Sequence, residues 1–205
     1  MEKIKSILLA ASVLLAALLI FSCSDNSNDS CCEDLIDLRD GAEYKTVKID
    51  NKIWMAKNLN YDISGSSCYG GALENCEKYG RLYSWELAKT ACPSNWRLPS
   101  KEEWEALVRT TGYFASKLKA AEWNGTDNYG FSALPGGNYF VNGIGSCDEP
   151  FNSFCNLNEK GFWWGTAKLA PYILEIGNVG NGFIYHSDLL PEYESNSFSI
   201  RCVSP

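Results

Sequence analysis

The chain has 205 residues, of which 45% are hydrophobic, and a formal net charge of −7. Removal of residues 1–22, argued below, would take away Glu2, Lys3 and Lys5 and leave 16 basic and 24 acidic side chains, a net charge of −8. This acidic balance argues against nucleic-acid partners and against electrostatic attraction to a membrane surface, and it leaves neutral ligands such as glycans, or protein partners.

The N-terminus is typical of an export signal. Lys3 and Lys5 precede an uncharged apolar run over residues 7–21, which has the length of a signal-peptide core and is short for a membrane span of about 20 residues. The run ends in Ser22-Cys23, which resembles the lipobox of bacterial lipoproteins, where the signal is cut before an acylated cysteine. The alternative is an ordinary secretory signal. We expect lipidation of Cys23, because two or more acyl chains anchor a protein stably.

The expected organisation is a signal peptide over residues 1–22, a lipidated tether over 23–42 and one domain over 43–205. Residues 24–40 are polar and acidic without hydrophobic periodicity, which is typical of a linker. The remaining chain is long enough for one domain with a sizeable core. We therefore expect a domain in the bacterial cell envelope, held at the outer membrane or cell surface by the lipid on Cys23.

The cysteines agree with export. Of nine cysteines, eight remain besides Cys23, an even number suited to an oxidising compartment. Cys31 and Cys32 are adjacent, and they are either reduced or paired elsewhere. Seven residues separate Cys68 from Cys76 and Cys147 from Cys155, and the chain has one histidine; this pattern does not indicate a zinc site, so no metal is expected. The expected disulfides are Cys68 with Cys76, Cys147 with Cys155, and Cys92 with Cys202.

The first half of the domain has clear secondary-structure signals. Residues 44–55 alternate around an Asp-Asn turn and predict a β-hairpin. Residues 61–80 are rich in glycine and serine and predict a loop closed by a disulfide. Ser84 is a candidate N-cap for a helix that stops before Pro93.

A second helix is predicted after Ser100. Ser100 and Glu103 have the spacing of a capping box, in which each side chain accepts a hydrogen bond from the other residue's backbone amide. Trp104, Leu107 and Val108 then form an apolar stripe of a helix that ends near residue 110. The dense aromatic and acidic stretch from Ala91 is therefore interpreted as scaffold and not as a catalytic carboxylate pair.

The second half is rich in glycine, asparagine and aromatic residues. Long loops are expected there, with short strands over residues 131–134, 161–168 and 197–203, and another strand pair over 172–178 and 182–187. In the last strand Phe198, Ile200 and Cys202 alternate with Ser199 and Arg201, as in a half-buried strand.

No catalytic residues and no cofactor are expected. His186 is the one histidine, and Asp188 is too near in sequence to orient it in a Ser-His-Asp triad. The pair Asp148-Glu149 is interpreted as solvated loop carboxylates, although two carboxylates could serve glycoside hydrolysis. No glycine-rich phosphate-binding loop is present.

Aromatic, amide and carboxylate side chains gather in the glycine-rich loop region. An aromatic ring can stack on the apolar face of a sugar while polar groups bind its hydroxyls, and the alternative is that these rings fill the core under long loops. The candidate ligand-binding residues are Trp123, Asn124, Asp127, Tyr129, Asn138 and Tyr139.

Six blocks together resemble one family, the Fibrobacter succinogenes major paralogous domain. They are "VKIDNKIWMAKNLNY", "CYGG…CEKYGRLYSWELA", "CPSNWRLPSKEEWEALV", "GFSALPGG", "GFWWGTA" and "FSIRCV", in the family's order over residues 44–203. The helix–"RLPSKEEW"–helix core also resembles formylglycine-generating enzymes and the C-type lectin-like fold. This resemblance implies an α+β domain in which two helices flank a small, twisted antiparallel sheet with long loops, stapled by disulfides such as Cys92–Cys202.

The resemblance implies no transferable site. Calcium-binding lectins use a Glu-Pro-Asn or Gln-Pro-Asp triplet, and here Phe151 follows Glu149-Pro150. Formylglycine-generating enzymes use reactive cysteines, and a Cys147–Cys155 bridge would leave none. The leading hypothesis is a non-enzymatic envelope module that binds a glycan or a protein partner. The alternatives are an enzyme or redox protein of the formylglycine-generating type, and a purely structural envelope lipoprotein.

Overall fold

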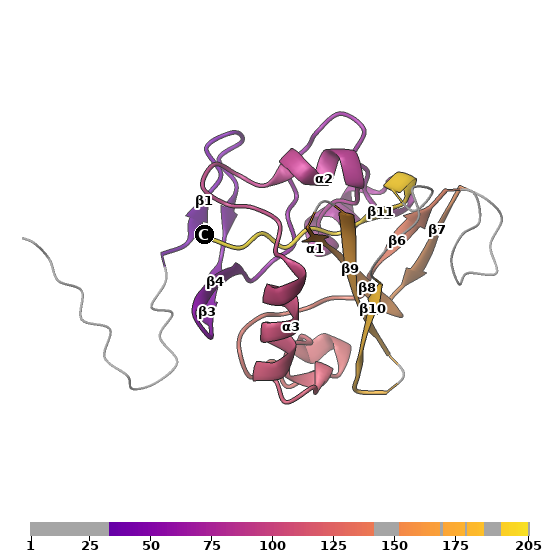
Figure 1. The fold of residues 1–205 in the computed structure, drawn as a ribbon. Coiled ribbons are helices and arrows are strands. Elements are labelled where there is room, and N and C mark those ends of the chain that lie inside the picture. Colours follow the sequence, from indigo (N-terminus) through magenta and orange to yellow (C-terminus); the bar gives the residue numbers. More distant parts are fainter. Residues whose placement is uncertain (1–32, 142–151, 169, 179, 187–193, 205) are drawn as a thin grey trace, which may run out of the picture.

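The computed structural model in Figure 1 describes residues 33–141, 152–168, 170–178, 180–186 and 194–204. These ranges contain three α-helices: α1 (Leu73–Tyr79), α2 (Trp85–Ala91) and α3 (Lys101–Thr110). Three short 3-10 turns lie at Tyr69–Gly71, Ala115–Lys117 and Ala121–Trp123. Within the described ranges, none of the helices has the length and apolar character needed to cross a bilayer.

The strands form two hairpin-like pairs and one larger mixed sheet. β1 pairs with β2 and β3 pairs with β4, while the larger sheet has the order β10-β9-β8-β6-β11-β5, with β7 also on β6. All neighbours are antiparallel except β6 and β8, which meet in parallel at Gly137 and Gly161. The strands are β1 (Leu35–Ile36), β2 (Glu43–Tyr44), β3 (Thr46–Ile49), β4 (Lys52–Met55), β5 (Tyr83–Ser84), β6 (Gly136–Phe140), β7 (Ser153–Leu157), β8 (Lys160–Ala167), β9 (Ala170–Gly177), β10 (Phe183–His186) and β11 (Ser197–Phe198).

Strand β8 separates two hydrophobic cores. Successive side chains of a strand point to opposite faces, so the adjacent Trp163 and Trp164 enter different cores. Trp164 packs with Trp85 of α2, at 5.4 Å between ring centroids, and Trp163 belongs to the core that contains Trp104 of α3. The two predicted helices therefore lie over different parts of the molecule, as α2 and α3 do in Figure 1.

The predicted capping box at the start of α3 is confirmed. The Ser100 hydroxyl accepts from the Glu103 amide at 3.2 Å, and the Glu103 carboxylate accepts from the Ser100 amide at 2.9 Å. The helix then sits close on β8, because a Cβ at Gly165 would lie 2.7 Å from the Trp104 indole. The scaffold interpretation of this stretch therefore agrees with its geometry.

Other predicted elements are also confirmed. The hairpin forms as β3 and β4, the helix after Ser84 forms as α2, and residues 161–168 lie largely within β8. β9 and β10 pair with each other, as expected for residues 172–178 and 182–187. Ser84 is the N-cap of α2 by position, although its side chain makes no capping hydrogen bond.

Two local expectations were wrong. The loop expected over residues 61–80 contains helix α1, which Gly80 ends at a positive φ of 76°. Residues 131–134 do not form a strand of a sheet and contribute one bridge, from Ala133 to Lys119. The strand in this region begins after Pro135, because β6 finds partners in β7, β8 and β11.

Among the described residues, secondary structure begins with Leu35, before the expected start of the domain at residue 43. Leu35 and Ile36 of β1 pair with β2, although residues 23–42 were expected to be a tether. The carboxylate of the buried Asp37 accepts the backbone amide and the guanidinium of Arg39, which stabilises the turn between these strands. The lipidation candidate Cys23 lies outside the described residues.

The C-terminal segment is buried on both sides, contrary to the expected alternation. Ser199 and Arg201 are as buried as Phe198 and Ile200, and β11 has two residues instead of a strand over 197–203. The segment runs between the two cores, so both of its faces meet protein. Its remaining backbone groups bond to separate segments, for example the Leu59 amide to the Ile200 carbonyl at 2.9 Å.

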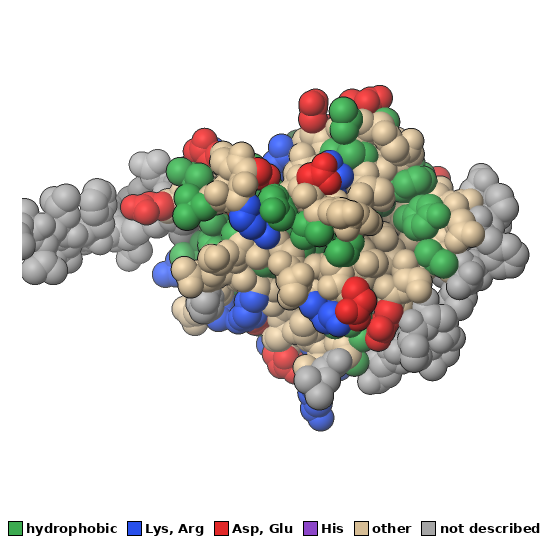
Figure 2. Space-filling view, turned by 90° about the horizontal axis from the view of Figure 1, so that it is seen from above, with side chains coloured by type: hydrophobic (Ala, Val, Ile, Leu, Met, Phe, Trp, Pro, Cys, Tyr) green, Lys and Arg blue, Asp and Glu red, His purple; other side chains and the backbone are tan. Residues whose placement is uncertain are grey.

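Two disulfides join described residues, Cys68–Cys76 and Cys92–Cys202, both of which were expected. Cys155 is also disulfide-bonded, and its expected partner Cys147 lies outside the described residues, as do Cys31 and Cys32. The second disulfide links the end of α2 to the C-terminal segment. On the face shown in Figure 2, acidic, basic and hydrophobic side chains are interspersed.

Candidate functional site

The six candidate ligand-binding residues do not form one site. Trp123 is 3% exposed, and its indole nitrogen donates to Asn178. Asn138 is fully buried and accepts from Asn156 at 2.8 Å. Trp123 and Asn138 therefore cannot present polar or aromatic surface to a sugar, because packing encloses both side chains.

The other candidates are divided between different surroundings. The carboxylate of Asp127 accepts from the amide and hydroxyl of Ser132, at 2.8 and 2.6 Å, which fixes a turn. Tyr129 donates its hydroxyl to the Thr110 carbonyl at 2.8 Å, and Tyr139 packs on Phe154 with ring centroids 4.8 Å apart.

Asn124 is exposed and lies at the rim of a small cavity. This cavity of about 140 Å³ is also lined by Trp123, Glu122, Asn158 and Asn178. It is small for a sugar ring with its hydroxyls, but Asn178 connects it to a larger neighbour. The expected loop site therefore lies beside, and not at, a larger hollow in this part of the molecule.

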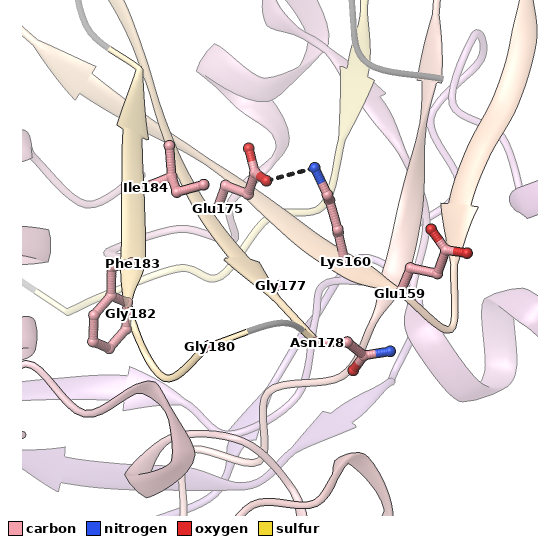
Figure 3. A pocket seen from close by; sticks show the side chains of 9 residues that line it. All are labelled: Glu159, Lys160, Glu175, Gly177, Asn178, Gly180, Gly182, Phe183 and Ile184. Carbon is pink, nitrogen blue, oxygen red and sulfur yellow. Dashed lines mark ion pairs between the residues drawn. The ribbon is translucent and has the colours of Figure 1, made fainter. Parts of the chain in front are cut away.

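That hollow is a pocket of about 760 Å³ over β8, β9 and β10, which we name the sheet pocket (Figure 3). Charged and apolar side chains share its lining. In Figure 3, Lys160 and Glu175 extend toward each other from neighbouring strands, and Ile184 stands on the next strand beside them. The lining residues are Glu159, Lys160, Glu175, Gly177, Asn178, Gly180, Gly182, Phe183 and Ile184.

Glu175 is the centre of the charged part of the sheet pocket. Its side chain is 6% exposed, and its two oxygens have different partners. Oε1 lies 2.9 Å from the Lys160 ammonium, and Oε2 lies 2.9 Å from Nε2 of His186. A nearly buried carboxylate is thus held in a fixed position by two basic side chains that themselves reach solvent.

The surroundings of Glu175 favour its ionised form. Burial raises the pKa of this carboxyl, but hydrogen bonds from His186 and Lys160 and the charge of Lys160 together lower it by more, so the pKa lies below its usual value. At neutral pH Glu175 is therefore a preformed acceptor for hydrogen bonds.

Strand register explains why these side chains meet. Glu175 lies opposite both Phe162 of β8 and Ile184 of β10, so all three share one face of the sheet. His186 and Lys160 lie two residues along their strands from these positions and therefore point to the same face. Cross-strand neighbours on one face are close enough for direct contact between long side chains.

Sequence reasoning missed this cluster. The strand pair was predicted, but the register that brings His186 to Glu175 was not worked out, and the search for its partner stopped at Asp188. The usable signal was the five-residue connection between the strands, which brings Ile184 opposite Glu175. Lys160 was harder to assign to this cluster from the sequence. The pairing of β8 with β9 places Lys160 opposite Gly177, so it reaches Glu175 diagonally and not from the directly opposite position.

The described lining of the sheet pocket offers groups for a small ligand and not for a metal ion. Among the described residues, no three His, Cys, Asp or Glu side chains gather as a metal site requires. The charged lining side chains offer the carboxylates of Glu159 and Glu175 as acceptors and the Lys160 ammonium as a donor, while Ile184 offers an apolar surface that is 52% exposed. This combination suits a ligand with hydroxyl groups around an apolar face.

Comparison with known proteins identifies the family of the chain. Neither a curated protein nor a solved structure matches it. Residues 47–204, more than half of the chain, match the Fibrobacter succinogenes major domain. This range includes both predicted helices, the two described disulfides and the sheet pocket. The chain therefore belongs to the Fibrobacter succinogenes major domain family.

Proposed function

We propose that this protein is a lipid-anchored module of the bacterial cell envelope that binds a glycan in the sheet pocket and is not an enzyme. Support for the anchor comes from the apolar run before Ser22-Cys23 and the paired cysteines of an exported domain. The observation that carries the binding proposal is the position of the fixed Glu175 carboxylate beside the exposed Ile184 side chain.

A sugar ring matches this arrangement. Its C–H face can lie on Ile184, while its hydroxyls donate to Glu175 and accept from Lys160. Because ion pairs already hold Glu175 in place, little side-chain entropy remains to be lost when a ligand binds. Asn178 adds an amide at the far side of the pocket, where it meets the cavity next to Asn124.

The state of Glu175 supports binding over hydrolysis. A glycosidase needs one carboxyl group with a raised pKa as its general acid. The pKa of Glu175 is shifted in the opposite direction, and both of its oxygens are engaged. The described lining also lacks serine, threonine and cysteine, the side chains that most often act as nucleophiles.

We further infer a C-type lectin-like fold, in which long loops carry ligands on a small sheet. Two features support it: α2 and α3 lie over different cores of one sheet, and the Cys92–Cys202 disulfide joins the end of α2 to the last segment. The three α-helices and the parallel contact between β6 and β8 are additions to the expected simple pattern.

A glycan array tests the binding proposal. The exported protein is applied to plant cell-wall and bacterial polysaccharides, with and without calcium, and bound glycans are then measured by calorimetry. Glu175→Gln is expected to weaken binding about tenfold or more, because it removes a charged hydrogen-bond acceptor. Ile184→Ser is expected to weaken it as well.

Ile36→Ser is the matched control, because Ile36 is similarly exposed but lies on β1. If the folded protein binds no glycan on the array, the glycan proposal is overturned, and envelope proteins become the candidates for its partner. Hydrolysis of a polysaccharide, lost in Glu175→Gln, would overturn the non-enzymatic assignment.

A further inference from the structure

A second hollow, which we name the basic pocket, differs from the rest of this acidic chain. It has a volume of about 470 Å³ and lies between β3, the segment after β4, α1, the loop at 130–134 and the C-terminal segment. Four of its lining residues are basic, namely Lys45, Lys57, Lys78 and Arg201, and one is acidic, Glu43. It shares no lining residue with the sheet pocket.

Arg201 forms the floor of the basic pocket and is 1% exposed. Its guanidinium donates from Nε to Asn58 at 2.9 Å and from Nη1 to the carbonyls of Met55 and Phe131. Nη2 donates to the Ser132 carbonyl at 3.3 Å, the longest of these bonds. A guanidinium has five N–H groups, so one N–H on Nη2 has no acceptor within the described part of the chain.

The positive charge of Arg201 lacks an ion-pair partner among the described residues. Its bonds run to carbonyl and amide oxygens, and its guanidinium lies 4.4 Å from the centre of the Phe131 ring. Burial lowers the pKa of Arg201 to about 9, while the nearby Asp127 charge acts in the opposite direction, so the group is charged at neutral pH. Partial charges of carbonyl groups offset a buried cation less well than an anion does.

The rim adds further positive charge with weak internal compensation. Lys78 has one carboxylate neighbour, Glu122, at 3.5 Å, and Lys57 takes part in no ion pair within the described residues. Lys45 pairs with Asp34. Both Lys57 and Lys78 can therefore turn toward a ligand at little cost.

We propose that the basic pocket binds a small oxyanion, either the carboxylate of an acidic sugar or a phosphate group, between the Lys57 and Lys78 ammonium groups and above Arg201. The anion supplies the charge that the floor lacks, and oxyanions accept several N–H bonds at once. This site is independent of the glycan site proposed above, because the two pockets have no lining residue in common.

Calorimetry on the full chain in a non-ionic detergent tests this proposal. The probes are inorganic phosphate, glucuronate and, as the neutral control, glucose. Lys57→Ala and Lys78→Ala are each expected to raise the Kd for the anion about threefold to fivefold, and Lys78→Glu to raise it further. Added salt is expected to raise the Kd, since the rim charges are exposed to screening.

Lys89→Ala is the matched control, because Lys89 has an exposure similar to that of Lys78 but lies on α2. It removes the same charge and is expected to leave the Kd unchanged. Glucuronate bound more tightly than phosphate would indicate an acidic sugar, and the reverse order a phosphate group. Absence of binding by both anions to a chain that melts cooperatively, or an equal loss in Lys89→Ala, would overturn the proposal.

Discussion

Glu103 and Glu175 are both carboxylates held by two basic side chains, but they belong to different kinds of region. Glu103 lies in the first turn of α3, where it accepts from the Ser100 amide and forms a two-bond pair with Arg97 at 2.7 Å. Glu175 lies in the middle of a sheet, at the floor of an open pocket. The Glu103 carboxylate satisfies a backbone amide at the start of a helix, whereas the Glu175 carboxylate faces a space that a ligand can enter.

The partners of these two carboxylates distinguish a structural residue from a residue of a binding site. The Glu103 carboxylate accepts from the Ser100 amide at the N-cap of α3, an amide that would otherwise be unpaired, so its charge has a structural use. Among the described residues, the partners of Glu175 are side chains alone, and no backbone amide donates to its carboxylate. A buried, paired carboxylate without a backbone task is costly for stability by itself, which favours a role in binding.

Removal of the Glu103 side chain is expected to have the largest effect on stability. Glu103→Ala loses half of the capping box and the pair with Arg97, and it should lower the free energy of unfolding by about 2 kcal/mol. Denaturant unfolding with the disulfides intact measures this. Glycan and anion binding should be unchanged in the folded variant, and a loss of binding would contradict the scaffold role.

Acid is expected to weaken the protein through the same group. Burial raises the pKa of Glu103, but Arg97, the Ser100 amide and Lys52 lower it by more, from 4.5 to about 2. A carboxyl with a lowered pKa stabilises the fold above its unfolded pKa, and this stability is lost as the pH falls. The loss should reach about 2 kcal/mol between pH 4.5 and 2, allowing for solvent screening.

Unfolding free energies of the wild type and Glu103→Gln across this pH range check the acid prediction. The variant should show a flatter dependence on pH, because one of the groups that bind protons on unfolding is missing. Glu175 contributes in the same direction, since its pKa is also lowered. Equal slopes for the two proteins would contradict the assignment to Glu103.

Glu175→Gln is expected to cost about 1 kcal/mol of stability, less than Glu103→Ala. Glutamine keeps the shape, and the Lys160 and His186 side chains, 28% and 38% exposed, can turn to water when the negative charge is gone. The same unfolding assay measures this loss. A loss greater than that of Glu103→Ala would make Glu175 a scaffold residue and remove the basis for the proposed site.

Glu105 provides the smallest expected effect. It lies in the same helix as Glu103, but its basic neighbours Lys101 and Arg109 are 4.0 Å away and its side chain is 39% exposed. Glu105→Ala should change the unfolding free energy by less than about 0.5 kcal/mol. A larger change would mean that removal of any acidic side chain from α3 destabilises the fold, and the contrast between Glu105 and Glu103 would then not hold.

The local signals of the sequence were reliable where the interactions are local. The capping box of Ser100 and Glu103, the hairpin of β3 and β4 and the pairing of β9 with β10 each depend on residues near one another in the chain. Helix α1 was missed because its sequence lacks a side-chain N-cap and follows several glycines. The spacing of residues in the sequence therefore predicted which helices and strands form better than it predicted where they begin and end.

The candidate site was less predictable, because exposure depends on what packs above a residue. Trp123 has the sequence surroundings of a sugar-stacking ring, yet neighbouring segments bury it and Asn178 binds its nitrogen. Arg201 has the spacing of a solvent-facing strand residue, yet the two cores enclose it. The alternation rule fails when both faces of a strand meet protein.

The sequence by itself determined the family and the helix and hairpin nuclei, since these follow from motifs and short-range hydrogen bonds. The positions of the cysteines and the family resemblance indicated the two disulfide pairs. The tertiary structure alone decided which charged residues share a pocket. Lys160, Glu175 and His186 come from three strands, and their contact depends on register, which shifts every side chain to the other face if it slips by one residue. Charge and burial at a site are therefore properties of the packed fold.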